Sequence, residues 1–202
     1  MFGTRPPPFG LPAACEAALR AAYARPPRAY HSAAHVDEVV GEFERVADWD
    51  RPGEVFWAIL CHDAIYEAGR TDNEARSAAL ARRLAGAHLR DAALDLDRVE
   101  QLILLTARHG GLTGAGLDRD AARFVDCDMA ILGAAPARFD AYDDAIRAEY
   151  AHVPADAYRA GRARFLAGLL AAPRIYCSDP FHDRLDAAAR ANLRRAVARL
   201  RG

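Results

Sequence analysis

Lysine is missing from this 202-residue sequence: all 27 of its basic residues are arginines. A mechanism that depends on a lysine side chain is therefore excluded. The formal net charge is only −1, so the composition gives no reason to expect nucleic acid or an anionic membrane surface as a partner.

Cysteines are few and far apart. Cys15, Cys61, Cys127 and Cys177 form no Cys-x-x-Cys motif, which predicts reduced thiols and not a disulfide framework or a zinc–thiolate site. The sequence also lacks the run of about 18 apolar residues that a transmembrane helix needs. Its first twelve residues lack the apolar segment of a secretory signal. We therefore expect a cytoplasmic protein with no membrane partner.

Alternation of apolar and polar residues, the pattern of a β-strand, is essentially absent, whereas helical periodicity runs through the chain. The sequence predicts one all-α domain over residues 1–202, a bundle of about eight helices. Residues 1–27 would form an N-terminal extension and a first helix. The helices of most interest are expected at residues 32–47, 52–67, 72–88, 95–108 and 120–132.

The central stretch, residues 57–66, is an apolar run with His62 and Asp63 in its middle. If it is helical, both side chains have apolar neighbours three and four positions away, so both point toward the interior. A buried carboxylate needs a partner. Three explanations are open: a metal ion, an ion pair, or a hydrogen-bonded core histidine beside a capping aspartate.

Two further polar side chains are expected on buried faces. His35 shares a helix face with Val39, although it could instead be a helix-start histidine bonded to the backbone. Asp128 has apolar residues at all four neighbouring positions, namely Phe124, Val125, Ile131 and Leu132. Asp126 lies on the flank of that stripe, where we expect it to meet Arg123 or solvent.

His35, His62, Asp63 and Asp128 together offer two imidazoles and two carboxylates. This donor set suits a divalent Mn, Fe, Co, Ni or Zn ion, and Mg less well because of the two imidazoles. Four protein ligands on an ion that prefers six leave positions for water and substrate, as a hydrolytic site requires. His109, at the end of its helix, is a further ligand, a substrate contact, or a histidine favoured by the helix dipole.

The order His, His-Asp, Asp on successive helices resembles the HD-domain superfamily of metal-dependent phosphohydrolases. The chain is similar in particular to the subfamily described as predicted metal-dependent HD phosphohydrolases. The similar segments are residues 28–35 (RAYHSAAH), 61–66 (CHDAIY), 71–77 (TDNEARS), 126–133 (DCDMAILG), 146–150 (IRAEY) and 174–176 (RIY). Ser32 stands where an asparagine is expected.

This resemblance implies an HD-like bundle in which His35, His62, Asp63 and Asp128 hold the ion. It also implies hydrolysis of a small phosphoester or nucleotide by a metal-activated water. A competing function is a non-catalytic metal- or nucleotide-binding module that signals through a partner. A third reading is a helical scaffold with buried His–Asp ion pairs and no metal.

A proton acceptor and cations complete the expected site. Glu74 and Asp72 are the candidates for taking or orienting the proton of the water, with Glu67 as a weaker third. Alternatively, Asp72 and Glu74 only cap a helix and favour its dipole. The candidate substrate contacts are Arg28, His31, Arg76, His109 and Arg147.

Overall fold

The computed structural model describes residues 3, 6–112 and 114–201; the remaining residues of the predicted domain (1, 2, 4, 5, 113 and 202) lie outside the described part. Within it the chain is helical and has no β-strand, which confirms the all-α prediction. It has nine α-helices, where about eight were expected, and three short 3-10 helices. No described helix is long and apolar enough to cross a membrane.

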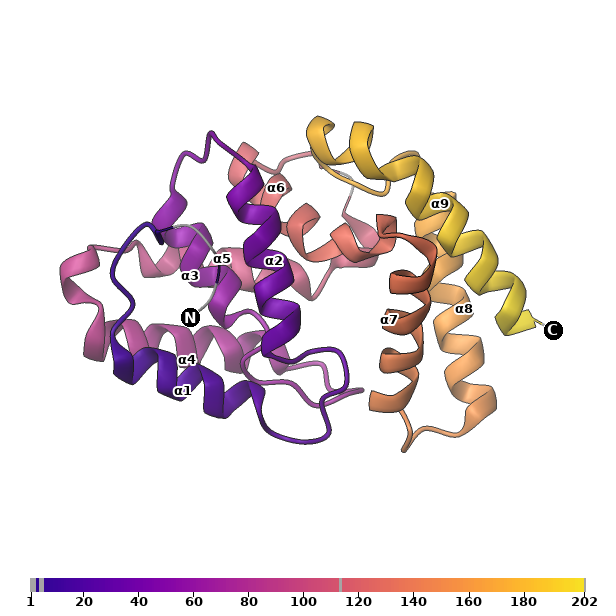
Figure 1. Ribbon diagram of the computed structural model, residues 1–202, viewed down its shortest axis with the longest axis horizontal. Helices are drawn as coiled ribbons and strands as arrows, with labels where there is room; N and C mark the ends of the chain where they lie inside the picture. Colours follow the sequence, from indigo (N-terminus) through magenta and orange to yellow (C-terminus); the bar gives the residue numbers. More distant parts are fainter. Residues whose placement is uncertain (1–2, 4–5, 113, 202) are drawn as a thin grey trace.

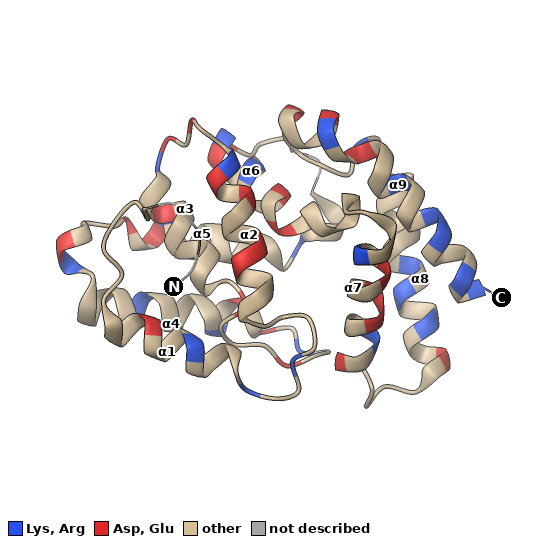
Figure 2. Ribbon diagram, in the orientation of Figure 1, with Lys and Arg blue, Asp and Glu red and all other residues tan. Residues whose placement is uncertain are grey.

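The helices follow one another with short connections. Their bounds are α1 Ala13–Tyr23, α2 Ala33–Arg45, α3 Pro52–Cys61, α4 Asn73–His88, α5 Leu96–Thr106, α6 Arg119–Met129, α7 Pro136–Glu149, α8 Ala155–Ala171 and α9 Asp179–Arg201, with the 3-10 helices η1 Arg90–Ala92, η2 His109–Gly111 and η3 Ala130–Gly133. Figure 1 shows α1, α3, α4 and α5 at one end, α2 and α6 in the middle, and α7, α8 and α9 at the other end. Arginines are most frequent along α9 (Figure 2).

Helix α3 lies at the centre of the first group and packs against α2, α4, α5 and α6. Every residue from Val55 to Cys61 is buried. The run is apolar on all sides of the helix because neighbours surround it on all sides. The side chain of Trp57, fully buried, donates its indole N–H to the carbonyl of Ala81 on α4 at 3.3 Å. Because α3 is buried in this way, its C-terminal end is held in place, and the polar residues His62 and Asp63 follow directly after it.

The predicted extent of the central helix, to about residue 67, is wrong. Helix α3 ends at Cys61, His62 occupies its C-cap, and Asp63 lies in the turn that follows. The sequence pattern could not show this end, because residues 64–66 keep the apolar character of the helix.

Two side chains from elsewhere replace the helical hydrogen bonds beyond Cys61. Arg28 donates to the carbonyls of Asp63 at 2.7 Å and Ala64 at 2.9 Å. The hydroxyl of Ser77 donates to the carbonyl of Ile65 at 3.1 Å and accepts from its N–H at 3.0 Å. These partners satisfy backbone groups that a longer helix would satisfy itself. The chain can therefore turn out of α3 directly after His62.

The C-terminal helices form the other side of the molecule. Helix α9 packs against α8, α7 and η3. Asn192 on α9 donates to the carbonyls of Leu132 and Ala134, both at 2.9 Å, and so ties α9 to the end of the α6 segment. The segment expected as one helix over residues 120–132 is α6 followed by the tighter η3. The space between this layer and the N-terminal helices holds the candidate site.

Candidate metal centre

The four predicted ligands converge. His35 stands in the first turn of α2, His62 and Asp63 follow α3, and Asp128 lies near the end of α6. The Nε2 atom of His35 is 3.2 Å from Nε2 of His62, 3.0 Å from Oδ1 of Asp128 and 3.6 Å from Oδ2 of Asp63. His62 Nε2 is 3.1 Å from Oδ2 of Asp63 and 3.5 Å from Oδ1 of Asp128. Three helices thus bring two nitrogens and two oxygens to one point.

The ring of His62 is oriented by the backbone. Its Nδ1 lies 2.8 Å from the carbonyl oxygen of Ile59, which can only accept a hydrogen bond. Nδ1 therefore carries a proton, and Nε2 of the neutral ring has a free lone pair facing the cluster. A carbonyl on the far nitrogen is the usual means by which proteins fix a metal-binding histidine.

The two carboxylates give this cluster a negative charge unless a proton or a metal ion is bound there. Burial alone would raise the pKa of the Asp63 and Asp128 carboxyl groups, but His62 and the other nearby histidines together outweigh burial and hold both pKa values below the usual range. Burial lowers the pKa of His62, yet the two aspartates raise it well above its usual value. Both carboxylates thus stay ionised and attract positive charge into the space between them and the imidazoles.

A divalent ion fits this donor set. His35, His62 and Asp128 each offer one ligand atom within 4.8 Å of the others, and Asp63 lies beside both histidines. Two nearly buried imidazoles and two ionised carboxylates are the ligands that borderline divalent metals take. Protons on the two Nε2 atoms are the alternative to a metal, since they would pair His62 with Asp63 at 3.1 Å and His35 with Asp128 at 3.0 Å. A cation satisfies all four atoms at once.

His109 extends the cluster on one side. Its Nε2 lies 3.2 Å from Oδ2 of Asp128, the oxygen that does not face His35. Burial lowers the pKa of His109, against the opposing effect of Asp128. The ring is therefore neutral at physiological pH and can donate or accept a hydrogen bond.

His31 is held by a glutamate that the sequence did not single out. Its Nδ1 is 2.6 Å from Oε2 of Glu149, and its ring stacks on Tyr66 at 3.9 Å between centroids. The other oxygen of Glu149 accepts the backbone N–H groups of Ala29, Tyr30 and His31 at 2.8–2.9 Å. Burial lowers the pKa of His31, but Asp63 and Glu149 raise it overall. Glu149 lies within the segment 146–150, one of those that resemble the HD family. This resemblance is the sequence feature that could have identified it.

The guanidinium of Arg28, expected as a substrate contact, is hydrogen-bonded to backbone carbonyls. Besides its two bonds to the turn after α3, its Nη1 donates to the carbonyl of His31 at 2.8 Å. Its guanidinium thus links the segment before α2 to the segment after α3. This places Arg28 behind the cluster as a support for His31 and Asp63.

Arg76 and Arg147 are not brought to the cluster. Arg76 pairs with Glu67 at 2.7 Å and is exposed. Arg147 donates to the carbonyl of Tyr150 at 2.9 Å and lies over the ring of Tyr158. Neither side chain lines the cavity described below.

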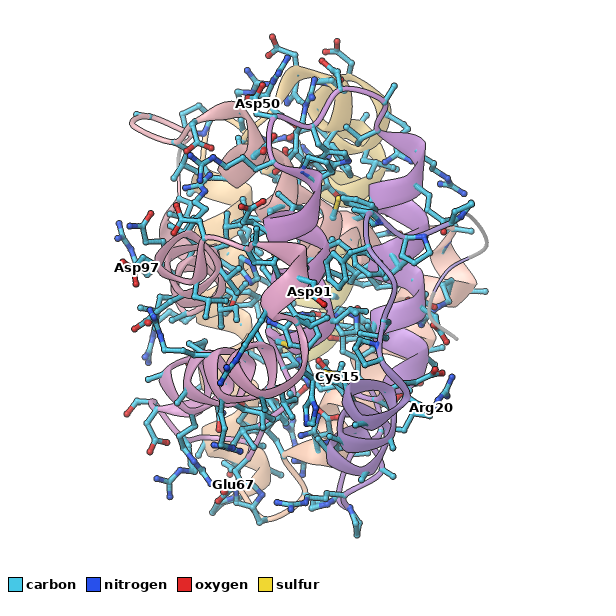
Figure 3. All side chains as sticks on the ribbon, turned by 90° about the vertical axis from the view of Figure 1, so that its left-hand side faces the viewer. Cys15, Arg20, Asp50, Glu67, Asp91 and Asp97 are labelled. Atoms are coloured by element: carbon cyan, nitrogen blue, oxygen red, sulfur yellow. The ribbon has the colours of Figure 1, made fainter. Side chains whose placement is uncertain are left out.

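The expected proton acceptors also lie elsewhere. Asp72 makes two 2.7 Å hydrogen bonds with Arg70, and Glu74 stands in the first turn of α4. Glu67 is exposed and lies at the edge of the molecule in Figure 3. None of the three lines the cavity at the cluster. The positions of Asp72 and Glu74 fit the alternative in which they favour the start of the helix.

The two aspartates of α6 face different partners. Asp128 points to the histidines, as its neighbours predicted. The expectation that Asp126 meets Arg123 or solvent is wrong: Asp126 is 1% exposed and accepts from the N–H groups of Cys177 and Ser178, each at 2.7 Å, and from the Ser178 hydroxyl at 2.6 Å. Its partners lie about fifty positions later in the chain, so local periodicity could not reveal them.

A cavity of about 820 Å³ opens onto the cluster. Asp128, His31 and His109 lie at its inner end, and Arg108 also lines it. A second cavity, of about 390 Å³, reaches Asp128 and His35 from the other side, between α2 and the start of α9. The candidate metal centre therefore has an accessible face as well as a buried one.

The chain was compared with protein-family models, with curated proteins and with solved structures, and none of the three comparisons gave a match. The fold and the site therefore rest on the residues and geometry given above.

Proposed function

We propose that this chain is a metal-dependent phosphohydrolase of the HD type, acting on a small phosphomonoester. The observation that carries the proposal is the convergence of the four ligand atoms on His35, His62, Asp63 and Asp128 at the inner end of a large cavity. The order of these residues along the chain, and the segments around them, add the sequence resemblance as independent support.

A divalent ion held by these residues supplies Lewis acidity, lowering the pKa of a bound water and polarising a phosphoryl oxygen. The chain supplies the rest. His109, neutral and beside Asp128, accepts a hydrogen bond from the attacking water or takes its proton. Arg108, at the same cavity wall, is placed to neutralise phosphoryl oxygens.

His31 is the group best placed to protonate the leaving oxygen. It lines the cavity, and its Nδ1 is engaged by Glu149, so its Nε2 is left for the substrate. The hydrogen bond and charge of Glu149 favour the protonated ring that a general acid requires, against the lowering effect of burial on its pKa. Tyr66 stacked on the imidazole fixes its plane.

The deciding experiment combines metal analysis with turnover. Purified protein is analysed for bound metal, then assayed with Mn, Co, Ni or Mg against a panel of phosphomonoesters and nucleotides. We expect about one equivalent or more of divalent metal and metal-dependent release of inorganic phosphate. Metal without turnover on any compound would favour the binding module, and absence of metal affinity would favour a scaffold of buried ion pairs.

A further inference from the structure

The outer wall of the large cavity is aromatic. Tyr142 on α7, Tyr150 at the end of α7, and Tyr158 and Phe165 on α8 all line it. Tyr142 and Tyr158 are buried, whereas Tyr150 and Phe165 are partly exposed to the cavity side. Flat side chains of this kind bury large apolar area and stack on planar groups. The wall therefore offers a surface for an apolar, planar ligand.

The arginine within that wall is already neutralised. Arg162 makes two hydrogen bonds to Oδ1 of Asp143, at 2.9 and 3.0 Å, and its guanidinium lies 5.2 Å from the ring centroid of Tyr142 and 5.6 Å from that of Phe165. Both side chains of the ion pair are nearly buried. Arg162 thus extends the stacking surface and brings no net charge to it.

Positive charge available to a ligand in the cavity is limited. His31 and Asp128 line it beside the candidate metal centre, and Arg108, an exposed residue next to His109, is among the described residues the one cavity arginine whose side chain has no ion-pair partner. One arginine and one ion match a single phosphoryl group. A chain of two or three phosphates would have to lie along the aromatic wall, where nothing compensates its charge.

We infer that the substrate of this site is a phosphomonoester with one phosphoryl group on a planar apolar group, which stacks on the wall between α7 and α8. The inference rests on the proposed function and narrows its substrate class. The volume agrees: about 820 Å³ is in the range of sites that enclose a drug-sized ligand, and a phosphate with a short polar tail would leave most of the wall unused.

Helix α8 offers a variant that changes the cavity with little risk to folding. Ala157, Gly161 and Phe165 are spaced four apart and line the same face, and a Cβ built on Gly161 would meet no atom within 4 Å. Gly161→Leu therefore fills space beside the wall without a clash. Gly168 lies on the same helix, is equally open and does not line the cavity, so Gly168→Leu is the matched control. Both changes favour helix formation.

The test compares two substrates whose leaving groups are both primary alkoxides, ethyl phosphate and 2-(1-naphthyl)ethyl phosphate, in metal-loaded protein. We expect kcat/KM to be at least tenfold higher for the naphthyl compound, since it adds buried apolar area. Gly161→Leu should reduce this preference at least fivefold, and Gly168→Leu should leave it unchanged. Equal kcat/KM for the two compounds in the wild type, or equal loss of preference in both variants, would overturn the inference.

Binding measurements separate this inference from the proposed function. The non-hydrolysable ethylphosphonate and 2-(1-naphthyl)ethylphosphonate are titrated into the metal-loaded protein by calorimetry. Tighter binding of the naphthyl compound, weakened by Gly161→Leu alone, supports the aromatic site even if no phosphoester is hydrolysed. Hydrolysis of ethyl phosphate with no advantage for the naphthyl group in rate or binding would leave the phosphohydrolase standing and remove its proposed specificity.

Discussion

The Nε2 atoms of His35 and His62 face each other at 3.2 Å, although the residues lie 27 positions apart and on different helices. The Nδ1–H of His62 donates to the carbonyl of Ile59, so the Nε2 of the neutral ring carries a lone pair that faces the cluster. Nδ1 of His35 has no hydrogen-bond partner among the described residues, and its Nε2 faces the same point as a second nitrogen that can bind an ion. The two carboxylates beside them define the kind of cation, because they add two oxygen ligands and two negative charges.

His62→Ala should abolish stoichiometric metal binding, because it removes one ligand and leaves Asp63 without the ion it shares. Metal content after dialysis against a limiting chelator measures the effect. His88→Ala on α4 is the control, since His88 is exposed and distant from the cluster in sequence and contacts. Retention of metal at the wild-type ratio in His62→Ala would show that the ion is bound elsewhere.

Substitutions of Asp126 and Asp128 on α6 should separate the effect on metal binding from the effect on stability. Asp128→Asn should lose metal and activity while the fold remains. Asp126→Ala should keep the metal per folded molecule but lower the free energy of unfolding by roughly 1–3 kcal/mol, because three buried donors lose their acceptor. Metal analysis and urea unfolding of both variants measure the two effects. Loss of metal in Asp126→Ala with intact Asp128→Asn binding would reverse the assignment.

The same two residues show what can and cannot be predicted from the sequence. Asp128 was placed correctly because its apolar neighbours Phe124, Val125, Ile131 and Leu132 all lie within four positions of it in the sequence. Asp126 was misplaced because its partners, Cys177 and Ser178, come from a loop before α9. Helical periodicity reports which face is buried and does not report which distant backbone groups need an acceptor.

The end of α3 was predicted wrongly for the same reason. Residues 62–66 read as helix because their apolar pattern continues, but Arg28 and Ser77 bind the backbone there and offer an alternative to helical hydrogen bonds. The all-α class was predictable, since it depends on local pattern over the whole chain. The support that Glu149 and Arg28 give to the site was not, because it depends on contacts between residues far apart in sequence.

His31→Asn tests the proposed general acid. Loss of a proton donor should slow hydrolysis of a substrate with an alkyl alcohol as leaving group by roughly 10²–10⁴. A substrate whose leaving group is a stable phenolate, such as 4-nitrophenyl phosphate, needs little protonation and should lose much less. Steady-state kinetics on both substrates, with metal content measured, give the comparison. An equal loss on both would assign His31 to binding or positioning instead.

Glu74→Gln should leave turnover within about twofold of wild type. Glu74 stands in the first turn of α4 and does not line the cavity, so its carboxylate acts on the helix dipole and not on the attacking water. The expected cost is stability of about 0.3–1 kcal/mol. A fall in kcat of roughly 10²–10⁴ at unchanged metal content would instead restore Glu74 as the general base predicted from the sequence.

Glu149→Gln tests the support beneath His31. Burial raises the pKa of Glu149, but His31 and the three N–H groups outweigh it and the net pKa lies below the ordinary value of 4.5. A carboxyl group whose pKa is lowered on folding adds stability above its ordinary pKa, and this contribution is lost as the pH falls through the folded value. His31, with its pKa raised from 6.5, adds stability below that value and loses it as the pH rises through its folded pKa.

The pair should therefore contribute most between about pH 4.5 and pH 6.5, and its contribution should fall as the pH rises from 6.5 through the raised pKa of His31. In that window we expect Glu149→Gln to lower the free energy of unfolding by on the order of 3 kcal/mol, as for a buried pair that loses one partner. The difference from wild type should shrink as the pH falls below 4.5, and should be lost once the pH has passed through the lower folded pKa, where the wild-type carboxylate is itself protonated. Urea unfolding across this pH range measures it, with Glu67→Gln, which breaks the exposed pair with Arg76, as the control expected to leave the stability nearly unchanged. A pH-independent difference would mean that Glu149 acts through packing and neutral hydrogen bonds, and that its charge does not stabilise the imidazolium of His31.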